Sequence, residues 1–171
     1  LPAPCPPARA PPRGSGEAPD ALCRKAPPLP PTIKAALVER HGDMAPSIAY
    51  GTGALAQSLV CECEYATVGE IRHAIKSLEV HNLTDLRRRV RVGMGPCQGE
   101  LCVARAAALL ARFGATTPEE ASYQLATFLE ERWKGIYPLA WGETLRESEF
   151  TYWLFQSVLG LGEADLAPPP K

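Results

Sequence analysis

The chain has 171 residues, of which 46% are hydrophobic, and its formal net charge at pH 7 is −1. This length suffices for one ordinary domain, and the near-neutral charge gives no reason to expect a nucleic-acid partner. No apolar run approaches the roughly 18 residues that a membrane-spanning helix needs, and no secretory signal opens the chain. We therefore expect a protein that is soluble or peripheral to a membrane, with no transmembrane segment.

Residues 1–31 differ in composition from the rest of the chain. They include eleven prolines and almost no bulky apolar side chains. Such a segment cannot bury enough surface to offset the entropy lost on ordering, so we expect a disordered, proline-rich linker. Cys5 and Cys23 lie within it and are therefore poor candidates for metal ligands. A short tail, residues 163–171, is also expected to be non-helical.

Helix signals follow one another beyond the linker, and strand signals are nearly absent. Residues 32–58 are expected to form a helical connector, with a helix over residues 32–43 and a glycine-containing link at residues 50–53. Thr67 and Glu70 have the spacing of a capping box that starts the next helix. The predicted core face of that helix carries Val68, Ile71, Ile75 and Leu78.

Further helices are predicted up to residue 159. Asn82 is expected to cap a helix that carries Leu83, Leu86 and Val90 and stops at the glycines of residues 93–95. A helix rich in alanine and leucine should run from Gln98 to residue 113, and Thr117 should cap another with Ala121, Leu125, Phe128 and Leu129 inside.

The last predicted helix covers about residues 143–159, and aromatic side chains gather in and before it. We expect most of them to form core, although tryptophan and tyrosine also favour interfaces. The residues concerned are Trp133, Tyr137, Trp141, Phe150, Tyr152, Trp153 and Phe155.

Four of the six cysteines fall in two tight pairs, Cys61 with Cys63 and Cys97 with Cys102. Four thiolates are what a [2Fe–2S] or [4Fe–4S] cluster requires. Zinc also accepts four thiolates, but its structural sites usually have two to four residues between the cysteines of each pair, and the first pair has one. Disulfides are a third interpretation, which an oxidising compartment would have to support. The spacing favours an iron–sulfur site and leaves the other two open.

Two features surround the second cysteine pair. Gly93, Gly95 and Gly99 would let the backbone approach sulfur and donate N–H···S bonds, or they could simply end one helix and start another. The basic run at residues 87–91 could offset the charge of a cluster or dock an acidic partner. It could equally be a solvated helix face.

Three segments resemble a known family: VCECE at residues 60–64, DLRRR at 85–89 and VGMGPCQGELC at 92–102. They resemble the [2Fe–2S] domain of the bacterioferritin-associated ferredoxin type (BFD-like), a small helix–turn–helix unit often appended to flavin-dependent oxidoreductases. The resemblance implies an all-α fold, with this domain over residues 59–114 and a helical C-terminal extension over residues 115–162. It also implies that the cluster ligands are Cys61, Cys63, Cys97 and Cys102.

Other segments are similar to the large subunit of anaerobic, quinone-linked glycerol-3-phosphate dehydrogenase. FLEERWKG at residues 128–135 and LRESEF at 145–150 match its C-terminal region, and ERHGD at 39–43 matches the segment before its cluster domain. This implies oxidation of sn-glycerol 3-phosphate to dihydroxyacetone phosphate, with electrons passing from FAD through the cluster to a membrane-associated iron–sulfur or quinone-reducing subunit. The implied location is the cytoplasm, at the inner face of the cell membrane.

The flavin-binding motif of that family is missing from this sequence. The family binds FAD through a strand followed by G-x-G-x-x-G, and no segment here has that form. We expect the flavin and substrate domain to lie outside this chain, which then carries no catalytic residues and is not catalytically complete alone. Two alternatives stay open: the cluster domain of another flavin dehydrogenase, acting on opines or amino acids, and a zinc-stapled interaction module without a redox role.

Overall fold

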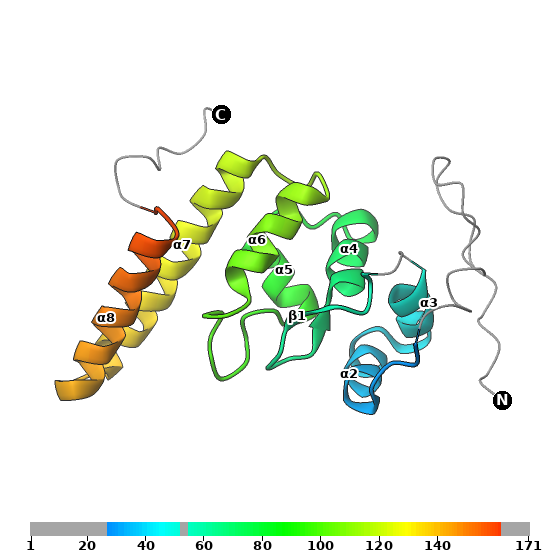
Figure 1. Ribbon diagram of the computed structural model, residues 1–171, viewed down its shortest axis with the longest axis horizontal. Coiled ribbons are helices and arrows are strands. Elements are labelled where there is room, and N and C mark those ends of the chain that lie inside the picture. The colour runs from blue at the N-terminus through cyan, green and yellow to red at the C-terminus, as the bar shows by residue number, and fades with distance from the viewer. Residues whose placement is uncertain (1–26, 52–54, 162–171) are drawn as a thin grey trace.

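The computed structural model describes residues 27–51 and 55–161, and these residues are mostly helical, as predicted (Figure 1). Residues 1–26 of the predicted linker, the tail at 163–171, and Cys5 and Cys23 lie outside the described residues. The helices are α2 (Pro31–His41), α3 (Ala45–Tyr50), α4 (Val68–Ser77), α5 (Leu83–Val90), α6 (Val103–Arg112), α7 (Pro118–Ile136) and α8 (Gly142–Val158), with short 3-10 turns η1 (Gly42–Met44) and η2 (Tyr137–Leu139).

A small β-hairpin precedes α4, and the sequence did not predict it. Strand β1 (Leu59–Cys61) pairs antiparallel with β2 (Ala66–Thr67), so that Leu59 lies opposite Thr67 and Cys61 opposite Ala66. Strands of three and two residues are too short to show the alternation by which a strand is recognised. The hairpin matters because it carries the first cysteine pair.

The predicted helix caps of α4 and α5 are confirmed. The hydroxyl of Thr67 accepts a hydrogen bond from the backbone N–H of Glu70, and the side-chain oxygen of Asn82 accepts one from Asp85. The capping box at Thr67 is only half formed, however. The Glu70 carboxylate turns away from the cap and binds Arg40 and His41 of α2.

Three element boundaries differ from the prediction. Helix α6 begins at Val103, not at Gln98, because Gln98 and Gly99 have positive φ angles, which a right-handed helix cannot contain. Helix α5 ends where Arg91 adopts the left-handed conformation, two residues before the predicted glycine stop. Part of the expected connector forms α3, which packs against the N-terminus of α4.

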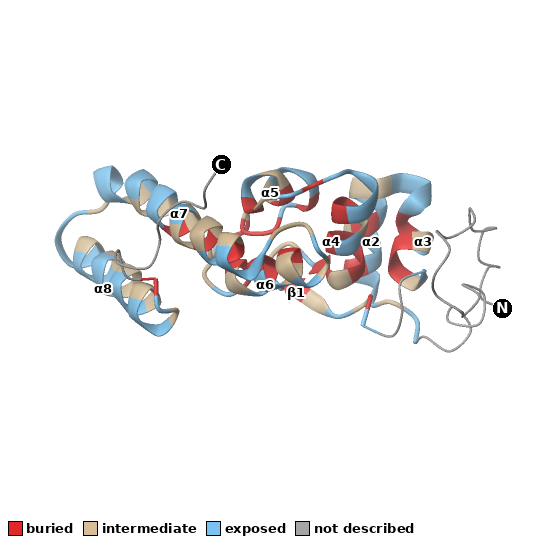
Figure 2. Cartoon of the chain, turned by 90° about the horizontal axis from the view of Figure 1, so that it is seen from above, coloured by how far each residue is buried: buried red, intermediate tan, exposed pale blue. Residues whose placement is uncertain are grey.

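The main core lies where α4, α5, α6 and the first half of α7 meet (Figure 2). Most predicted core positions are confirmed, with Ile71 and Leu86 fully buried. Leu78 is an exception: it lies just beyond the end of α4 and is 40% exposed, whereas Ala74 takes the buried position. Cys61 and Cys102 are part of this core, so one cysteine of each pair is anchored from inside.

A second, smaller core joins α2 to α3 and uses Ile33, Leu37, Ala45, Ile48 and Ala49. This unit sits tightly on α4, because a Cβ atom at Gly69 would lie 2.6 Å from the carbonyl oxygen of Ile48. Only glycine fits at that approach. Residues 31–50 are therefore packed on the cysteine-bearing region rather than leading loosely into it.

Helices α7 and α8 form a hairpin at the other end of the molecule (Figure 1). The expectation that most aromatic side chains here form core is wrong for Tyr137, Trp141, Phe150 and Trp153, which are all more than half exposed. Trp133 and Tyr152 stack with ring centroids 5.3 Å apart and are partly buried. Among the described helices, none is both long and apolar enough to cross a membrane.

Candidate metal centre

The fold brings the two cysteine segments together and pairs each cysteine with one from the other segment. Cys61 ends β1 and Cys63 lies in the hairpin turn, whereas Cys97 lies in the loop after α5 and Cys102 is the N-cap residue of α6. The Sγ atoms of Cys63 and Cys97 are 3.6 Å apart. Cys61 and Cys102 lie close enough that each thiol shifts the pKa of the other. All four cysteines are free thiols.

Backbone amides surround these sulfur atoms. The amide of Gly93 lowers the pKa of both Cys61 and Cys102, and its predicted role as a donor to a metal-bound sulfur stays a prediction. The amides of Gly99 and Leu101 lower the pKa of Cys97. Amide donors of this kind stabilise thiolate and tune the potential of a metal bound to it.

The hydrogen bonds move the thiol pKa values in opposite directions. The Cys102 thiol is the main reason that the pKa of Cys61 falls to about 5, and the amide of Gly93 lowers it further, against the opposing effect of burial. The same contact with Cys61 raises the pKa of Cys102, as does burial. Burial also raises the pKa of Cys97, but the amides of Leu101 and Gly99 outweigh it, and the net pKa is below the ordinary value.

Two glycines leave no room for a side chain beside the thiols. A Cβ atom at Gly95 would lie 2.2 Å from Cβ of Cys63 and 3.4 Å from its sulfur. Gly99 has a φ of +93°, and its Cβ would lie 2.8 Å from the ring of Phe128. Glycine at position 95 therefore lets the cysteine loop close over the hairpin turn, and glycine at position 99 lets the loop pack against Phe128.

The two thiol pairs differ in exposure. Cys61 and Cys102 are 1% and 0% exposed, whereas Cys63 and Cys97 are only partly buried. The site thus has an inner pair fixed in the core and an outer pair near the surface.

This donor set fits a two-metal cluster better than a single ion. Two thiolates on one tetrahedral metal, each about 2.3 Å from it, lie about 3.8 Å apart, which is close to the separation of Cys63 and Cys97. Within the described residues, no group of three or more His, Cys, Asp or Glu side chains is arranged around one point to hold one metal ion. A mononuclear zinc site would need all four thiols around one centre, whereas a [2Fe–2S] cluster takes two at each iron.

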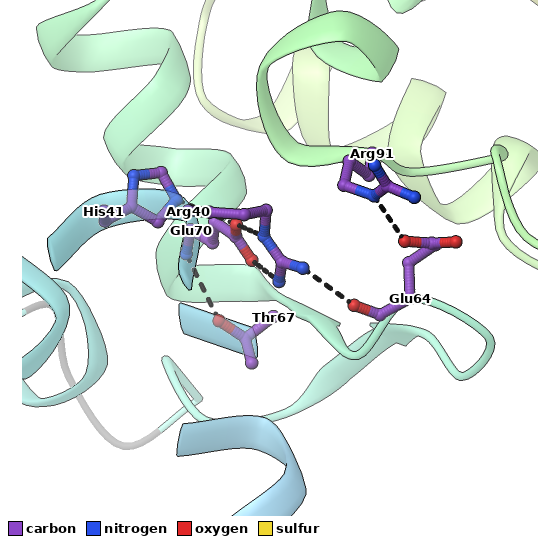
Figure 3. A network of polar contacts seen from close by, with 6 residues as sticks. All are labelled: Arg40, His41, Glu64, Thr67, Glu70 and Arg91. Carbon is purple, nitrogen blue, oxygen red and sulfur yellow. Dashed lines mark hydrogen bonds and ion pairs between the residues drawn. The ribbon is translucent and has the colours of Figure 1, made fainter. Parts of the chain in front are cut away.

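A buried ionic network connects α2 to the hairpin that carries the first cysteine pair (Figure 3). The Glu70 carboxylate is fully buried and accepts hydrogen bonds from Arg40, through Nε and Nη2, and it is 2.8 Å from Nε2 of His41. Nη1 of Arg40 also donates to the backbone carbonyl of Glu64, at 3.0 Å. The side chain of Glu64 in turn pairs with Arg91 at 2.7 Å.

Sequence reasoning missed this network. Arg40 and His41 belong to the ERHGD segment, but their contacts with Glu70 span 30 and 29 residues and no local pattern predicts them. The network fixes the residue that follows Cys63, and so steadies the turn that holds the outer thiol.

The basic run at residues 87–91 is divided among several roles. Arg91 pairs with Glu64, and Arg88 lies 3.4 Å from Asp85 at an exposed position. Arg87 instead lies over the ring of Phe128, with its guanidinium carbon 5.9 Å from the ring centroid. The interpretation as a uniform solvated face therefore holds only for part of the run.

Comparison with protein families defines the class of the cysteine-bearing region. Residues 59–112 match the family described as BFD-like [2Fe-2S] binding domain. All four paired cysteines lie inside this match. The chain therefore contains a domain of the BFD-like [2Fe–2S]-binding class, built on the hairpin and α4 to α6.

The similarity extends beyond that domain, to a subunit of anaerobic glycerol-3-phosphate dehydrogenase. The chain is 53% identical to this subunit from Escherichia coli over 148 residues, 86% of its length, and 51% identical to the one from Haemophilus influenzae over 150 residues. It is homologous to the C-terminal part of these proteins. The aligned region spans only 27% and 26% of the two relatives, about a quarter of their length. No solved structure matches the chain.

Proposed function

We propose that this chain is the iron–sulfur electron-transfer portion of an FAD-dependent anaerobic glycerol-3-phosphate dehydrogenase, with Cys61, Cys63, Cys97 and Cys102 as the ligands of a [2Fe–2S] cluster. The observation that carries the proposal is the pair of cross-segment thiol contacts inside the BFD-like region. One contact, Cys63 with Cys97, would serve one iron. The other, Cys61 with Cys102, would serve the second.

The residues around the thiols have defined tasks in this proposal. The amides of Gly93, Gly99 and Leu101 lower the pKa of the thiols beside them and would offset part of the negative charge of four thiolates. The core buries Cys61 and Cys102 away from water, and Gly95 has no side chain that would clash with Cys63. A bound cluster supplies a one-electron carrier, which links two-electron flavin chemistry to stepwise acceptors.

The wider assignment follows the relatives. Since their name is that of a glycerol-3-phosphate dehydrogenase, we propose that electrons taken from sn-glycerol 3-phosphate by FAD, as dihydroxyacetone phosphate forms, pass through this region toward quinone. The partners would be a flavin-binding domain or subunit of the same enzyme and a membrane-associated iron–sulfur or quinone-reducing subunit. The place of action would be the cytoplasm, at the inner face of the membrane.

A second parent enzyme has one observation in its favour. The chain is also 40% identical over 50 residues to hydrogen cyanide synthase subunit HcnB of Pseudomonas aeruginosa. That match covers 29% of this chain, compared with 86% for the E. coli dehydrogenase. The longer similarity, which extends outside the BFD-like region, favours the glycerol-3-phosphate enzyme.

The metal assignment is tested by a visible absorption spectrum with iron, sulfide and zinc analysis of the anaerobically purified chain. About two irons and two sulfides per chain, with colour that bleaches on reduction, are expected. A variant with Cys97→Ser and Cys102→Ser should lose the colour. One zinc per chain without colour would overturn the redox proposal and leave a structural metal domain.

The assignment to a parent enzyme is tested by a chimera. The aligned region of this chain replaces the corresponding C-terminal region of the E. coli relative, and the loaded chimera is mixed anaerobically with glycerol 3-phosphate. We expect the cluster absorbance to bleach. A chimera that binds FAD and cluster but does not bleach would contradict the assignment while leaving the metal site intact.

A further inference from the structure

A groove of about 810 Å³ lies between α5 and α7 and ends at the loop that carries Cys97. Its walls come from helical repeats: Leu83 and Arg87 on α5, and Phe128, Arg132 and Gly135 on α7. Residues three or four positions apart in a helix share a face, so both walls are single helix faces. A Cβ atom added at Gly135 would meet nothing within 4 Å, which keeps this part of the groove open.

The groove holds two arginines whose hydrogen bonds are incomplete. The Nε atoms of Arg87 and Arg132 are buried and have no hydrogen-bond partner. The carboxylate of Glu131 also lines the groove, but it is exposed and already paired with Lys134 at 3.0 Å. Buried guanidinium N–H groups without partners are costly, and a carboxylate is the group that satisfies them best.

The groove is in direct contact with the cysteine loop. Arg87 donates to the side-chain oxygen of Gln98 at 3.4 Å, and the amide nitrogen of Gln98 donates to the carbonyl oxygens of Met94 and Gly95. The ring of Phe128, under Arg87, packs against Gly99. The groove therefore opens beside the outer thiol pair, the part of the site nearest the surface.

We propose that this groove is a docking site for an acidic segment of the protein that exchanges electrons with the cluster, with one or more carboxylates seated on Arg87 and Arg132. The proposal rests on the proposed function for the identity of the partner. The positive charge of Arg87 and Arg132, in a groove beside the proposed redox site, attracts and orients an acidic partner and raises the rate of encounter. The two arginines in the groove wall select this partner chemistry, because a carboxylate is the group that pairs best with a guanidinium.

The test compares two variants that each remove two positive charges. The groove variant carries Arg87→Gln and Arg132→Gln. The control carries Arg88→Gln and Arg146→Gln, which are 70% and 75% exposed, pair with local carboxylates and do not line the groove. Far-UV circular dichroism and cluster absorbance of both must equal those of the parent chain, and single variants replace any double variant that does not fold.

The first readout is the rate at which the dithionite-reduced cluster is oxidised by an anionic or a cationic reagent. Hexacyanoferrate(III) or hexaamminecobalt(III) takes one electron from the reduced cluster and becomes hexacyanoferrate(II) or hexaamminecobalt(II). In the groove variant we expect the rate with the anion to fall about three- to tenfold at low salt, and the difference to vanish at high salt. An equal fall in the control, or an equal fall with the cation, overturns the proposal.

The second readout does not need the cluster. A fluorescein-labelled peptide of glutamates should bind the full chain, loaded or metal-free, more tightly than a matched peptide of glutamines, and the groove variant but not the control should lose that binding. Equal binding by all three proteins overturns the proposal. A parent chain that holds no cluster yet shows this pattern would defeat the proposed function and keep the groove.

Discussion

The cysteine-bearing region and the α7–α8 hairpin are both helical and both rich in apolar residues, but they use those residues differently. In the first, α4, α5 and α6 surround fully buried side chains such as Ile71, Leu86 and Leu110. In the second, α8 buries no residue (Figure 2). Its Phe150 and Trp153 are more than 60% exposed. The cysteine-bearing region therefore uses its apolar residues to fix the positions of the thiols from inside. The α7–α8 hairpin instead exposes many of its apolar side chains.

The strongest test of this contrast is Arg40→Ala, in the buried network that steadies the cysteine hairpin. Removing one partner leaves the carboxylate of Glu70 buried and without its main partner, which typically lowers the free energy of unfolding by about 3–5 kcal/mol. Urea unfolding of the metal-free chain measures this loss. The control is Arg88→Ala at an exposed pair, for which a change of about 0–1 kcal/mol is expected. Equal losses would show that the network contributes no more than a surface pair.

The next test compares a core leucine with an exposed aromatic residue. Leu86→Ala should cost about 2–5 kcal/mol because the side chain is fully buried. Phe150→Ala, at a residue 63% exposed, should change stability by about 0.5 kcal/mol or less. Thermal unfolding of the full chain gives both values. A large loss for Phe150→Ala would mean that α8 is covered in solution.

A smaller effect on stability, but a direct one on the site, is expected for Gly95→Ala. The added methyl would meet Cys63, so that the loop must move, at a cost of about 1–3 kcal/mol. Cluster content and the rate of colour loss under a chelator report the outcome, and both should worsen. Gly135→Ala on α7 is the matched control, since its Cβ meets nothing and alanine suits a helix interior. The two variants behaving alike would argue against tight closure of the loop.

The smallest effects are those of the helix caps. Thr67→Ala removes a cap that is fully buried in the cysteine-bearing region, and we expect a loss near 2 kcal/mol, at the upper end of the range for caps. Thr117→Ala removes an exposed cap of α7 and should cost about 0.5–1 kcal/mol. Thermal unfolding of both variants at the same pH measures the two losses of stability. If the order were reversed, burial would not be what makes the first cap more important.

Local sequence signals predicted much of this structure. The caps at Thr67, Asn82 and Thr117 depend on contacts three residues apart, and all three are present. The predicted core face of α5 is confirmed, and so is that of α7 except for Phe128, which is only partly buried. The two cysteine pairs were expected to meet, and the contact of Cys63 with Cys97 brings them together.

Features that depend on distant parts of the chain could not be predicted. The pairing of Arg40 with Glu70 joins two helices across 30 residues. The sequence showed that aromatic side chains gather in and before α8, but it cannot show whether another element covers them, so the core expectation for Trp153 was wrong. The late start of α6 depends on positive φ angles at Gln98 and Gly99, which belong to the loop around the thiols.

The crossed pairing of the thiols has a thermodynamic consequence for the chain itself. With the cluster bound as proposed, Cys63 and Cys97 are tied together across 34 residues, as a disulfide would tie them. Closing a loop of that length removes conformational freedom from the unfolded chain and stabilises the folded one by about 4 kcal/mol in the chain-entropy model. Loss of iron would then lower the folding stability of this region as well as remove its redox capacity. The supply of metal would therefore affect the fraction of the protein that stays folded.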